Sequence, residues 1–96
     1  MAQRSFYVIA YDVVNDRRRL KVARLLERYG ERVQYSVFEM YLSDQEWQQV
    51  QKNLQRLLNS QEDSVRVYRL CAMCRTRTMH LGVGETLPPP GPVVIV

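Results

Sequence analysis

The sequence predicts an α+β domain in which two helices cover one face of a four-stranded antiparallel sheet. Segments with the hydrophobic patterns of strands occur at residues 5–12, 32–42 and 65–70. Two amphipathic segments with helical spacing separate them, one ending at Tyr29 and the other at Leu58. The order strand, helix, strand, strand, helix, strand is that of the split βαβ, or ferredoxin-like, arrangement.

The first strand and the first helix can be derived from local patterns. Residues 5–12 are apolar on both alternating faces, as is typical of a central strand. Asn15 or Asp16 is expected to cap the helix that follows, and Gly30 occupies the position where a left-handed residue commonly ends a helix. The apolar stripe that should face the sheet consists of Val22, Leu25, Leu26 and Tyr29.

The second half of the domain contains a hairpin, a helix and an edge strand. Alternation within residues 32–42 changes phase near Ser36, which indicates two strands in a tight hairpin, although one bulged strand would explain the same shift. Ser43 and Glu46 form a capping box. Residues 65–70 have the mixed pattern of an edge strand. The apolar stripe of the second helix consists of Trp47, Val50, Leu54, Leu57 and Leu58.

The fold predicted in this way leaves one sheet face without helices, and a second copy or another partner should bury its apolar side chains. We divide the chain into a core at residues 1–75 and a tail at residues 76–96. Four prolines exclude regular structure from much of the tail, but residues 93–96 are apolar and strand-like, and suit pairing with a sheet edge such as a partner's.

Composition limits the class of protein. The 96 residues suffice for one core, and 46% hydrophobic and 25% charged residues are typical of a soluble globular domain. No stretch approaches the roughly 20 apolar residues of a membrane span, and the N-terminus lacks a secretory pattern, so we expect a cytoplasmic protein without a membrane partner. Cys71 and Cys74 have only His80 nearby as a third ligand, which is too few for structural zinc.

The charge favours a nucleic-acid partner. Lys and Arg number 14 against 10 Asp and Glu, and 12 of the 14 cations are arginines, whose planar fork matches phosphate. Four of these cations recur at spacings of four, three and four, which places them along one line of the first helix. This basic row can bind phosphates or can simply be a solvated helix face; it consists of Arg17, Lys21, Arg24 and Arg28.

Asp12 is the best candidate for a reactive group. It follows a buried strand and precedes a helix, so a rigid element fixes its position, although strand-ending turn residues look the same. Carboxylate oxygens bind the hard cations Mg²⁺ and Mn²⁺, which assist phosphodiester cleavage. Asp16 can support such a site or serve only as a helix cap. One carboxylate per chain is few, and a two-fold axis near Asp12 would double the number.

Other catalytic classes lack the residues that they need. His80 is the single histidine, which excludes a histidine pair for acid and base catalysis within one chain. Neither a Walker-type phosphate loop nor a serine nucleophile elbow occurs, so ATP hydrolysis and acyl transfer are set aside.

Several stretches share their residue order with one known family. They are Tyr11-Asp12-Val13, residues 15–22, Tyr29-Gly30, residues 32–39, residues 63–68 and Leu70-Cys71. Together they closely resemble the CRISPR-associated protein 2 family, the small nuclease-like partner of the spacer integrase. The resemblance covers residues 5–74 and leaves the tail out.

The resemblance implies a ferredoxin-like homodimer in which Asp12 of each chain faces the other across the two-fold axis and shares a catalytic Mg²⁺, with Mn²⁺ also possible. It implies metal-dependent endonuclease activity on single-stranded RNA or double-stranded DNA, and a place at the centre of the spacer-integration complex. By the same resemblance, Tyr11, Arg18, Arg32 and Phe38 line the shared groove. Arg32 can instead be a surface residue at a strand start, and Phe38 an ordinary core residue.

Two other functions stay open beside the endonuclease. One is a non-enzymatic scaffold in which the basic rows of two chains hold duplex DNA while the tail docks on the integrase. The other is an mRNA-cutting toxin of similar fold. The sequence does not choose between RNA and DNA, because phosphate contacts carry no base information.

Overall fold

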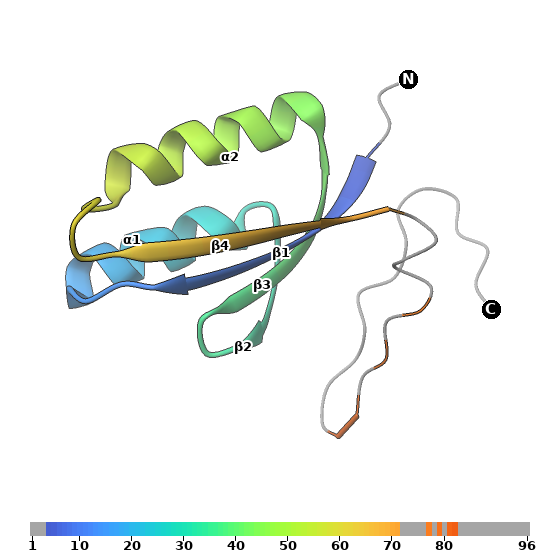
Figure 1. Ribbon diagram of the computed structural model, residues 1–96, viewed down its shortest axis with the longest axis horizontal. Helices are drawn as coiled ribbons and strands as arrows, with labels where there is room; N and C mark the ends of the chain where they lie inside the picture. Colours follow the sequence, from blue (N-terminus) through green and yellow to red (C-terminus); the bar gives the residue numbers. More distant parts are fainter. Residues whose placement is uncertain (1–3, 72–76, 78, 80, 83–96) are drawn as a thin grey trace.

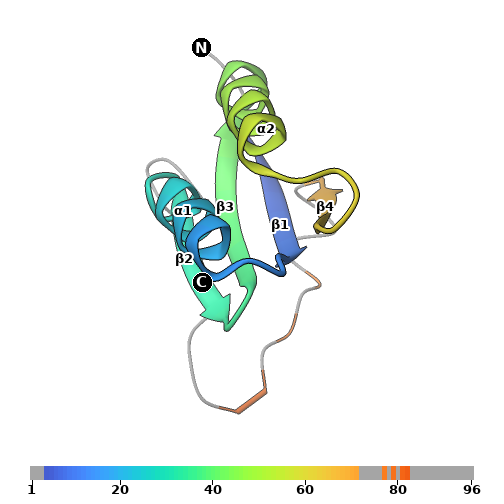
Figure 2. The same ribbon diagram turned by 90° about the vertical axis from the view of Figure 1, so that its left-hand side faces the viewer.

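The computed structural model describes residues 4–71, 77, 79, 81 and 82, and these form the predicted ferredoxin-like fold. The elements are β1 (Arg4–Asp12), α1 (Asp16–Glu27), β2 (Gly30–Gln34), β3 (Val37–Ser43), α2 (Asp44–Leu57) and β4 (Ser64–Leu70). The strands pair antiparallel in the order β2-β3-β1-β4 (Figure 1). Both helices lie on the same side of the sheet (Figure 2). The strand expected at residues 93–96 lies outside the described residues, as do Cys74 and His80.

The core lies between the helices and β1, which is a central strand as predicted. Tyr7, Ile9 and Tyr11 alternate toward the helices and are at most 5% exposed. Tyr7 stacks on Trp47 of α2 with ring centroids 5.1 Å apart. Each fully buried aliphatic or aromatic side chain contributes about 1.5–3 kcal/mol. The helix residues buried against this face are Val22, Ala23, Leu25, Leu26, Val50 and Leu54.

The start and end of α1 differ in how well the sequence indicates them. Asn15 caps the helix as predicted, because its side chain accepts a hydrogen bond from the N–H of Arg18 at 3.0 Å. The prediction that Gly30 ends α1 in a left-handed conformation is wrong. Among the described residues only Gly82 has a positive φ, and Gly30 begins β2. Gly30 is needed for space, since a Cβ there would lie 2.2 Å from the Glu39 carbonyl oxygen and 2.5 Å from the Met40 Cβ.

We therefore expect Gly30→Ala to lower the free energy of unfolding by about 3 kcal/mol, because β3 must move away to admit the methyl group. Urea unfolding measures this as a lower midpoint with an unchanged slope. Gln34→Ala, at an exposed position of the same strand, serves as the control. Equal midpoints for the two variants would show that β3 accommodates the added carbon without strain.

The hairpin between β2 and β3 contains both features that the phase change suggested. Two strands are present, as predicted, and the register between them shifts between Arg32 and Gln34. Arg32 pairs with Phe38, whereas Gln34 pairs with Val37. The irregularity therefore ends the alternation of β2 just before the turn and leaves Arg32 beside Phe38.

The capping box of α2 is confirmed. Ser43 Oγ accepts a hydrogen bond from the N–H of Glu46 at 3.1 Å, and Glu46 Oε1 accepts one from the N–H of Ser43 at 2.9 Å. Val50 and Leu54 are buried as expected, and the other members of the stripe pack partly buried against the core. Ser43 pairs with Arg4, so this cap lies at the end of β1 opposite to Asp12.

Candidate active site at the end of β1

Asp12 ends β1 on the face of the sheet on which no helix of the described residues packs, and we call this face the open face. Tyr11 points toward the helices, and the alternation of the strand therefore places Asp12 on the other side. The residue is exposed, and its Cα partner in β4 is Ser64. Within the part of the chain that the structure describes, the Asp12 carboxylate forms no hydrogen bond or ion pair. Its oxygens are thus available to a ligand in the described structure.

The described residues of one chain supply few further donors for a cation. No group of three His, Cys, Asp or Glu side chains that can hold a metal ion occurs among them. Asp16 lies in the first turn of α1 and forms an ion pair with Arg19. Asp12 fits Mg²⁺ or Mn²⁺ in its chemistry, because carboxylate oxygen is the preferred donor of both, but a single chain completes only part of a site.

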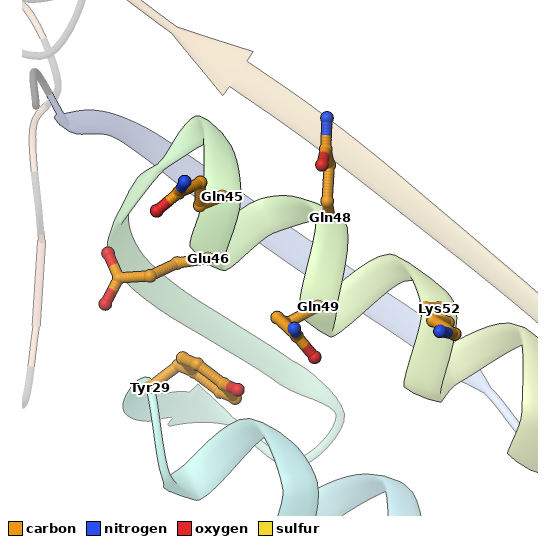
Figure 3. A pocket seen from close by; sticks show the side chains of 6 residues that line it. All are labelled: Tyr29, Gln45, Glu46, Gln48, Gln49 and Lys52. Carbon is orange, nitrogen blue, oxygen red and sulfur yellow. The ribbon is translucent and has the colours of Figure 1, made fainter.

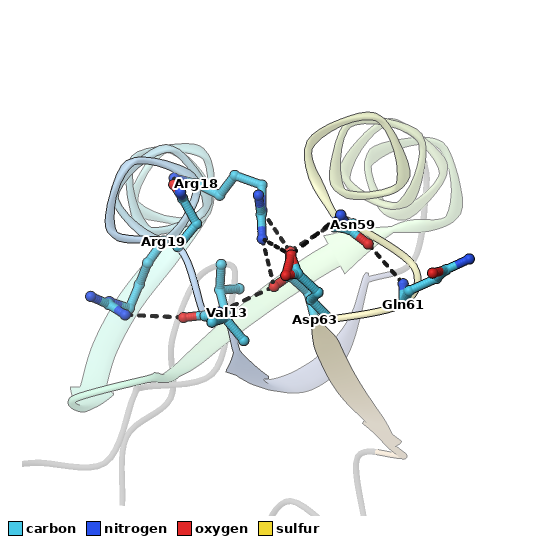
Figure 4. Close-up of polar contacts among 9 residues, drawn as sticks. Val13, Arg18, Arg19, Asn59, Gln61 and Asp63 are labelled. Atoms are coloured by element: carbon cyan, nitrogen blue, oxygen red, sulfur yellow. Dashed lines mark hydrogen bonds and ion pairs between the residues drawn. The ribbon is translucent and has the colours of Figure 1, made fainter.

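Among the described residues, the carboxylate near Asp12 that accepts the most hydrogen bonds is that of Asp63, which lies just before β4 (Figure 4). Its side chain is 0% exposed. Arg18 donates to it from Nε at 2.8 Å and from Nη2 at 3.3 Å. The backbone N–H groups of Val14 and Asn59 donate to it at 3.1 and 2.9 Å. Asp63 therefore joins the loop after β1, the first turn of α1 and the turn after α2.

These donors stabilise the charged form of Asp63. The hydrogen bond from Arg18 is the largest contribution, the one from the Asn59 N–H adds to it, and together they lower the pKa of Asp63 to about 2. The hydrogen bond to Asp63 in turn raises the pKa of Arg18. Arg18, predicted to line a groove, thus has its guanidinium engaged with Asp63 and, at 3.4 Å, with Glu62. Its contact with a nucleic acid stays a prediction.

The lowered pKa of Asp63 makes the stability of the fold depend on pH. The folded-state pKa of about 2 lies below the ordinary value of 3.8, so the stabilisation is present above about pH 4 and is lost as the pH falls toward 2. We expect Tm to fall between pH 5 and pH 2, and to fall less steeply in Asp63→Asn, which lacks this titration. Thermal scans across that range measure the difference. Parallel curves for parent and variant would contradict the assignment.

Tyr11, Phe38 and Arg32 come together on the helix side of the sheet. Tyr11 and Phe38 are 5% and 0% exposed, and their rings stack with centroids 6.1 Å apart. The Arg32 guanidinium carbon lies 5.5 Å from the centroid of the Phe38 ring. The alternative prediction that Phe38 is a core residue is therefore confirmed. Of the three, only Arg32 is exposed, and the groove contacts of all three stay predictions.

The four side chains of the basic row are exposed along α1. In the described part of the chain none of them forms an ion pair, in contrast to their neighbours Arg18 and Arg19. From Arg17 to Arg28 the row extends for about 17 Å along the helix. Solvated cations at this spacing are free to meet a phosphate backbone.

Comparison with known proteins places this geometry in a family. The family model described as "CRISPR associated protein Cas2" matches residues 5–78. The chain belongs to the Cas2 family. A relative from Synechocystis sp., named CRISPR-associated endoribonuclease Cas2 3, is 48% identical over 93% of this chain and 97% of its own length. One from Chloroflexus aurantiacus, named CRISPR-associated endoribonuclease Cas2 1, is 49% identical over 88% of this chain and 89% of its own.

Solved structures agree with the family assignment. A chain in a partial Cas6-RT-Cas1–Cas2 complex superimposes with a TM-score of 0.70 at 32% identity, and the match covers 80% of this chain and 90% of that one. In this Cas2-family chain, no helix among the described residues is long and apolar enough to cross a membrane.

A depression of about 640 Å³ between the end of α1 and α2 is separate from Asp12 (Figure 3). Figure 3 shows Tyr29 below Glu46 and Gln49, so the lining comes from α2 and from the turn after α1. It lies beside the start of α2, and Ser43, which precedes α2, pairs with Arg4. Arg4 is eight residues, or about 26 Å, from Asp12 along β1. The full lining is Tyr29, Gln45, Glu46, Gln48, Gln49 and Lys52.

Sequence reasoning did not single out Asp63 as a site residue. Its partners Val14 and Arg18 are 49 and 45 positions away, and no local pattern relates them. The only signal was its place just before β4, within one of the stretches that resemble the family.

Proposed function

We propose that this Cas2-family chain is a CRISPR adaptation protein that acts as a metal-dependent endonuclease, with Asp12 of two copies holding one Mg²⁺ or Mn²⁺. The observation that carries the proposal is the exposed Asp12 carboxylate at the end of the central strand, on the open face, which has no partner among the described residues. The names of the Synechocystis and Chloroflexus relatives, both endoribonucleases, support a nuclease.

The open face supports the pairing of two copies. Val8, Ala10, Val37 and Tyr41 are half-buried on it, and Tyr68 is 51% exposed. Among the described residues no helix packs on this face (Figure 2). An apolar sheet surface of this kind is usually covered by a partner. Because Asp12 ends β1 on the same face, two sheets packed face to face around a two-fold axis that runs along the strands beside β1 bring the two Asp12 carboxylates toward each other.

The open face carries acidic side chains toward its β2 edge and a basic side chain at its β4 edge. Glu31 and Glu39 are direct Cα partners in β2 and β3, and such like charges destabilise a sheet unless a cation lies nearby. Arg66 lies on the same face at the opposite edge, in β4. Within the described part of the chain, none of the three forms an ion pair. A two-fold axis along the strands brings Arg66 of one copy over the acids of the other.

The chain's own groups account for the parts of a phosphodiester hydrolysis. Asp12 holds the cation, and a hard divalent cation supplies polarisation of the phosphate and activation of water. Arg32 and the basic row lie on the helix side of the sheet, and as exposed cations they can bind phosphates of the nucleic acid away from the cation. The paired end of β1 keeps the Asp12 carboxylate in place.

A second function is favoured by the basic row, whose cations form no ion pair within the described part of the chain. Two copies present two such rows, which suits the holding of a duplex independently of cutting. The solved chain in a partial Cas6-RT-Cas1–Cas2 complex supports an integrase subunit as partner. We therefore propose that the same homodimer is the DNA-holding core of the spacer-integration complex, and family membership favours this role over an mRNA-cutting toxin.

Cleavage of labelled single-stranded RNA and duplex DNA by the purified protein tests the proposal, with Mg²⁺, Mn²⁺ or a chelator present. We expect cutting of at least one substrate with either metal and none with the chelator. The substrate that is cut identifies RNA or DNA as the target. Binding of duplex DNA without cutting of either substrate would leave the scaffold function and reject the endonuclease.

A further inference from the structure

We propose that Asp63 is a positioning residue for Asp12: its buried carboxylate fixes the loop after β1 and thereby holds the Asp12 side chain where a cation can bind. This inference rests on the proposed function, because the placement of Asp12 affects the reaction only if Asp12 binds the metal.

The carboxylate of Asp63 uses both oxygens twice. Oδ1 accepts from the Val14 N–H at 3.1 Å and from Arg18 Nη2 at 3.3 Å. Oδ2 accepts from Arg18 Nε at 2.8 Å and from the Asn59 N–H at 2.9 Å. An asparagine at this position has one acceptor oxygen and an amide group that only donates. It would leave part of this donor set without an acceptor, so the site requires a carboxylate.

These contacts act on Asp12 from two directions. Val14, two residues after Asp12, is held through its N–H. Ser64, the residue after Asp63, is the Cα partner of Asp12 in β4. Asp63 therefore ties the loop after Asp12 to the strand that pairs with Asp12. Loss of its contacts would free this loop and let the end of β1 fray.

A second set of contacts stiffens the same loop. Arg19 Nη1 donates to the Val13 carbonyl at 3.0 Å, and Val13 itself is 3% exposed (Figure 4). Val13 is thus fixed by the core and by Arg19, whereas Val14 is 62% exposed and its N–H is held by Asp63. The Asp63 contacts are the ones that a single isosteric substitution can weaken.

The test compares Asp63→Asn with Ser43→Ala in the full-length chain, at a temperature where circular dichroism shows both variants folded. Ser43→Ala removes the cap of α2 at the opposite end of β1, so it controls for lost stability. Three experiments are carried out: amide hydrogen exchange at residues 11–16, calorimetric titration for the Kd of Mn²⁺, and cleavage kinetics for the kcat and KM of the nucleic acid.

We expect Asp63→Asn to accelerate exchange at Val14 and to raise the Kd of Mn²⁺ about 10- to 100-fold, as is usual when a residue supporting a metal ligand is lost. The value of kcat should fall at subsaturating Mn²⁺, while KM for the nucleic acid stays unchanged, because phosphate contacts are untouched. Ser43→Ala should leave all of these quantities at their parent values.

Equal Mn²⁺ affinity in Asp63→Asn and Ser43→Ala, with cleavage intact, would overturn the positioning role and leave the proposed function standing. A parent protein that neither binds Mn²⁺ nor cuts would overturn both. If Asp63→Asn does not fold, Val14→Pro replaces it, since proline has no N–H to donate to Asp63. An unchanged Kd of Mn²⁺ in Val14→Pro would then count against the proposal.

Discussion

Replacement of Asp12 by asparagine is expected to lower the rate of metal-dependent cleavage by about 100- to 1000-fold, a loss typical of removing one preorganised electrostatic contact from an active site. The amide has nearly the same shape but no negative charge, so it binds a divalent cation weakly. Because Asp12 is exposed and makes no described side-chain contact, the fold should not suffer. Single-turnover cleavage with saturating Mn²⁺, together with a thermal scan, measures both effects.

Asp16→Asn is the matched control for this prediction. Asp16 is also exposed, lies one turn further along the chain, and carries the same charge. Its ion pair with Arg19 is at the surface, where such pairs contribute about 0–1 kcal/mol. We expect cleavage by this variant to match that of the parent. If Asp12→Asn cuts as fast as Asp16→Asn, Asp12 does not hold the metal.

Charge reversal on the basic row is expected to weaken duplex DNA binding by about 10-fold or more at moderate salt. Arg17→Glu combined with Arg24→Glu changes two exposed cations on the outer side of α1, which are not ion-paired in the described structure. Each phosphate contact that is lost should also reduce the salt slope of binding by about 0.9. Titration of labelled duplex at several salt concentrations gives the affinity and the slope together.

Lys52→Glu combined with Arg56→Glu provides the control, because it makes the same change in charge on exposed positions of α2. A general effect of net charge would weaken binding equally in both double variants. A specific contact predicts a much smaller loss in the α2 variant. Unchanged affinity after reversal of Arg17 and Arg24 would show that the basic row is only a solvated helix face.

Most of the fold could be predicted from the sequence because short-range patterns determine it. The two-sided hydrophobicity of β1, the Asn15 cap and the capping box of Ser43 with Glu46 each lie within one element or at its edge. Gly30 shows where such reasoning fails. Its position after a helix suggested a left-handed turn, but the backbone of β3, about ten residues later in the chain, is what excludes a side chain there.

The candidate site could be predicted only in part, for a similar reason. The position of Asp12 follows from its place at the end of a buried strand. The family resemblance placed Arg18 in the shared groove, and only the folded chain brings Asp63 within 2.8 Å of it. The burial of Tyr11 and Phe38 likewise depends on the pairing of β1 with β3, which composition and spacing do not determine.

The stoichiometry of Mn²⁺ binding tests the central claim most directly. Titration of the purified protein, followed by calorimetry and by the electron paramagnetic resonance of free Mn²⁺, gives the number of ions bound per chain. A site shared between two Asp12 carboxylates predicts one ion for every two chains, and loss of that ion in Asp12→Asn. One ion per chain, or binding that survives in Asp12→Asn, would contradict the shared site.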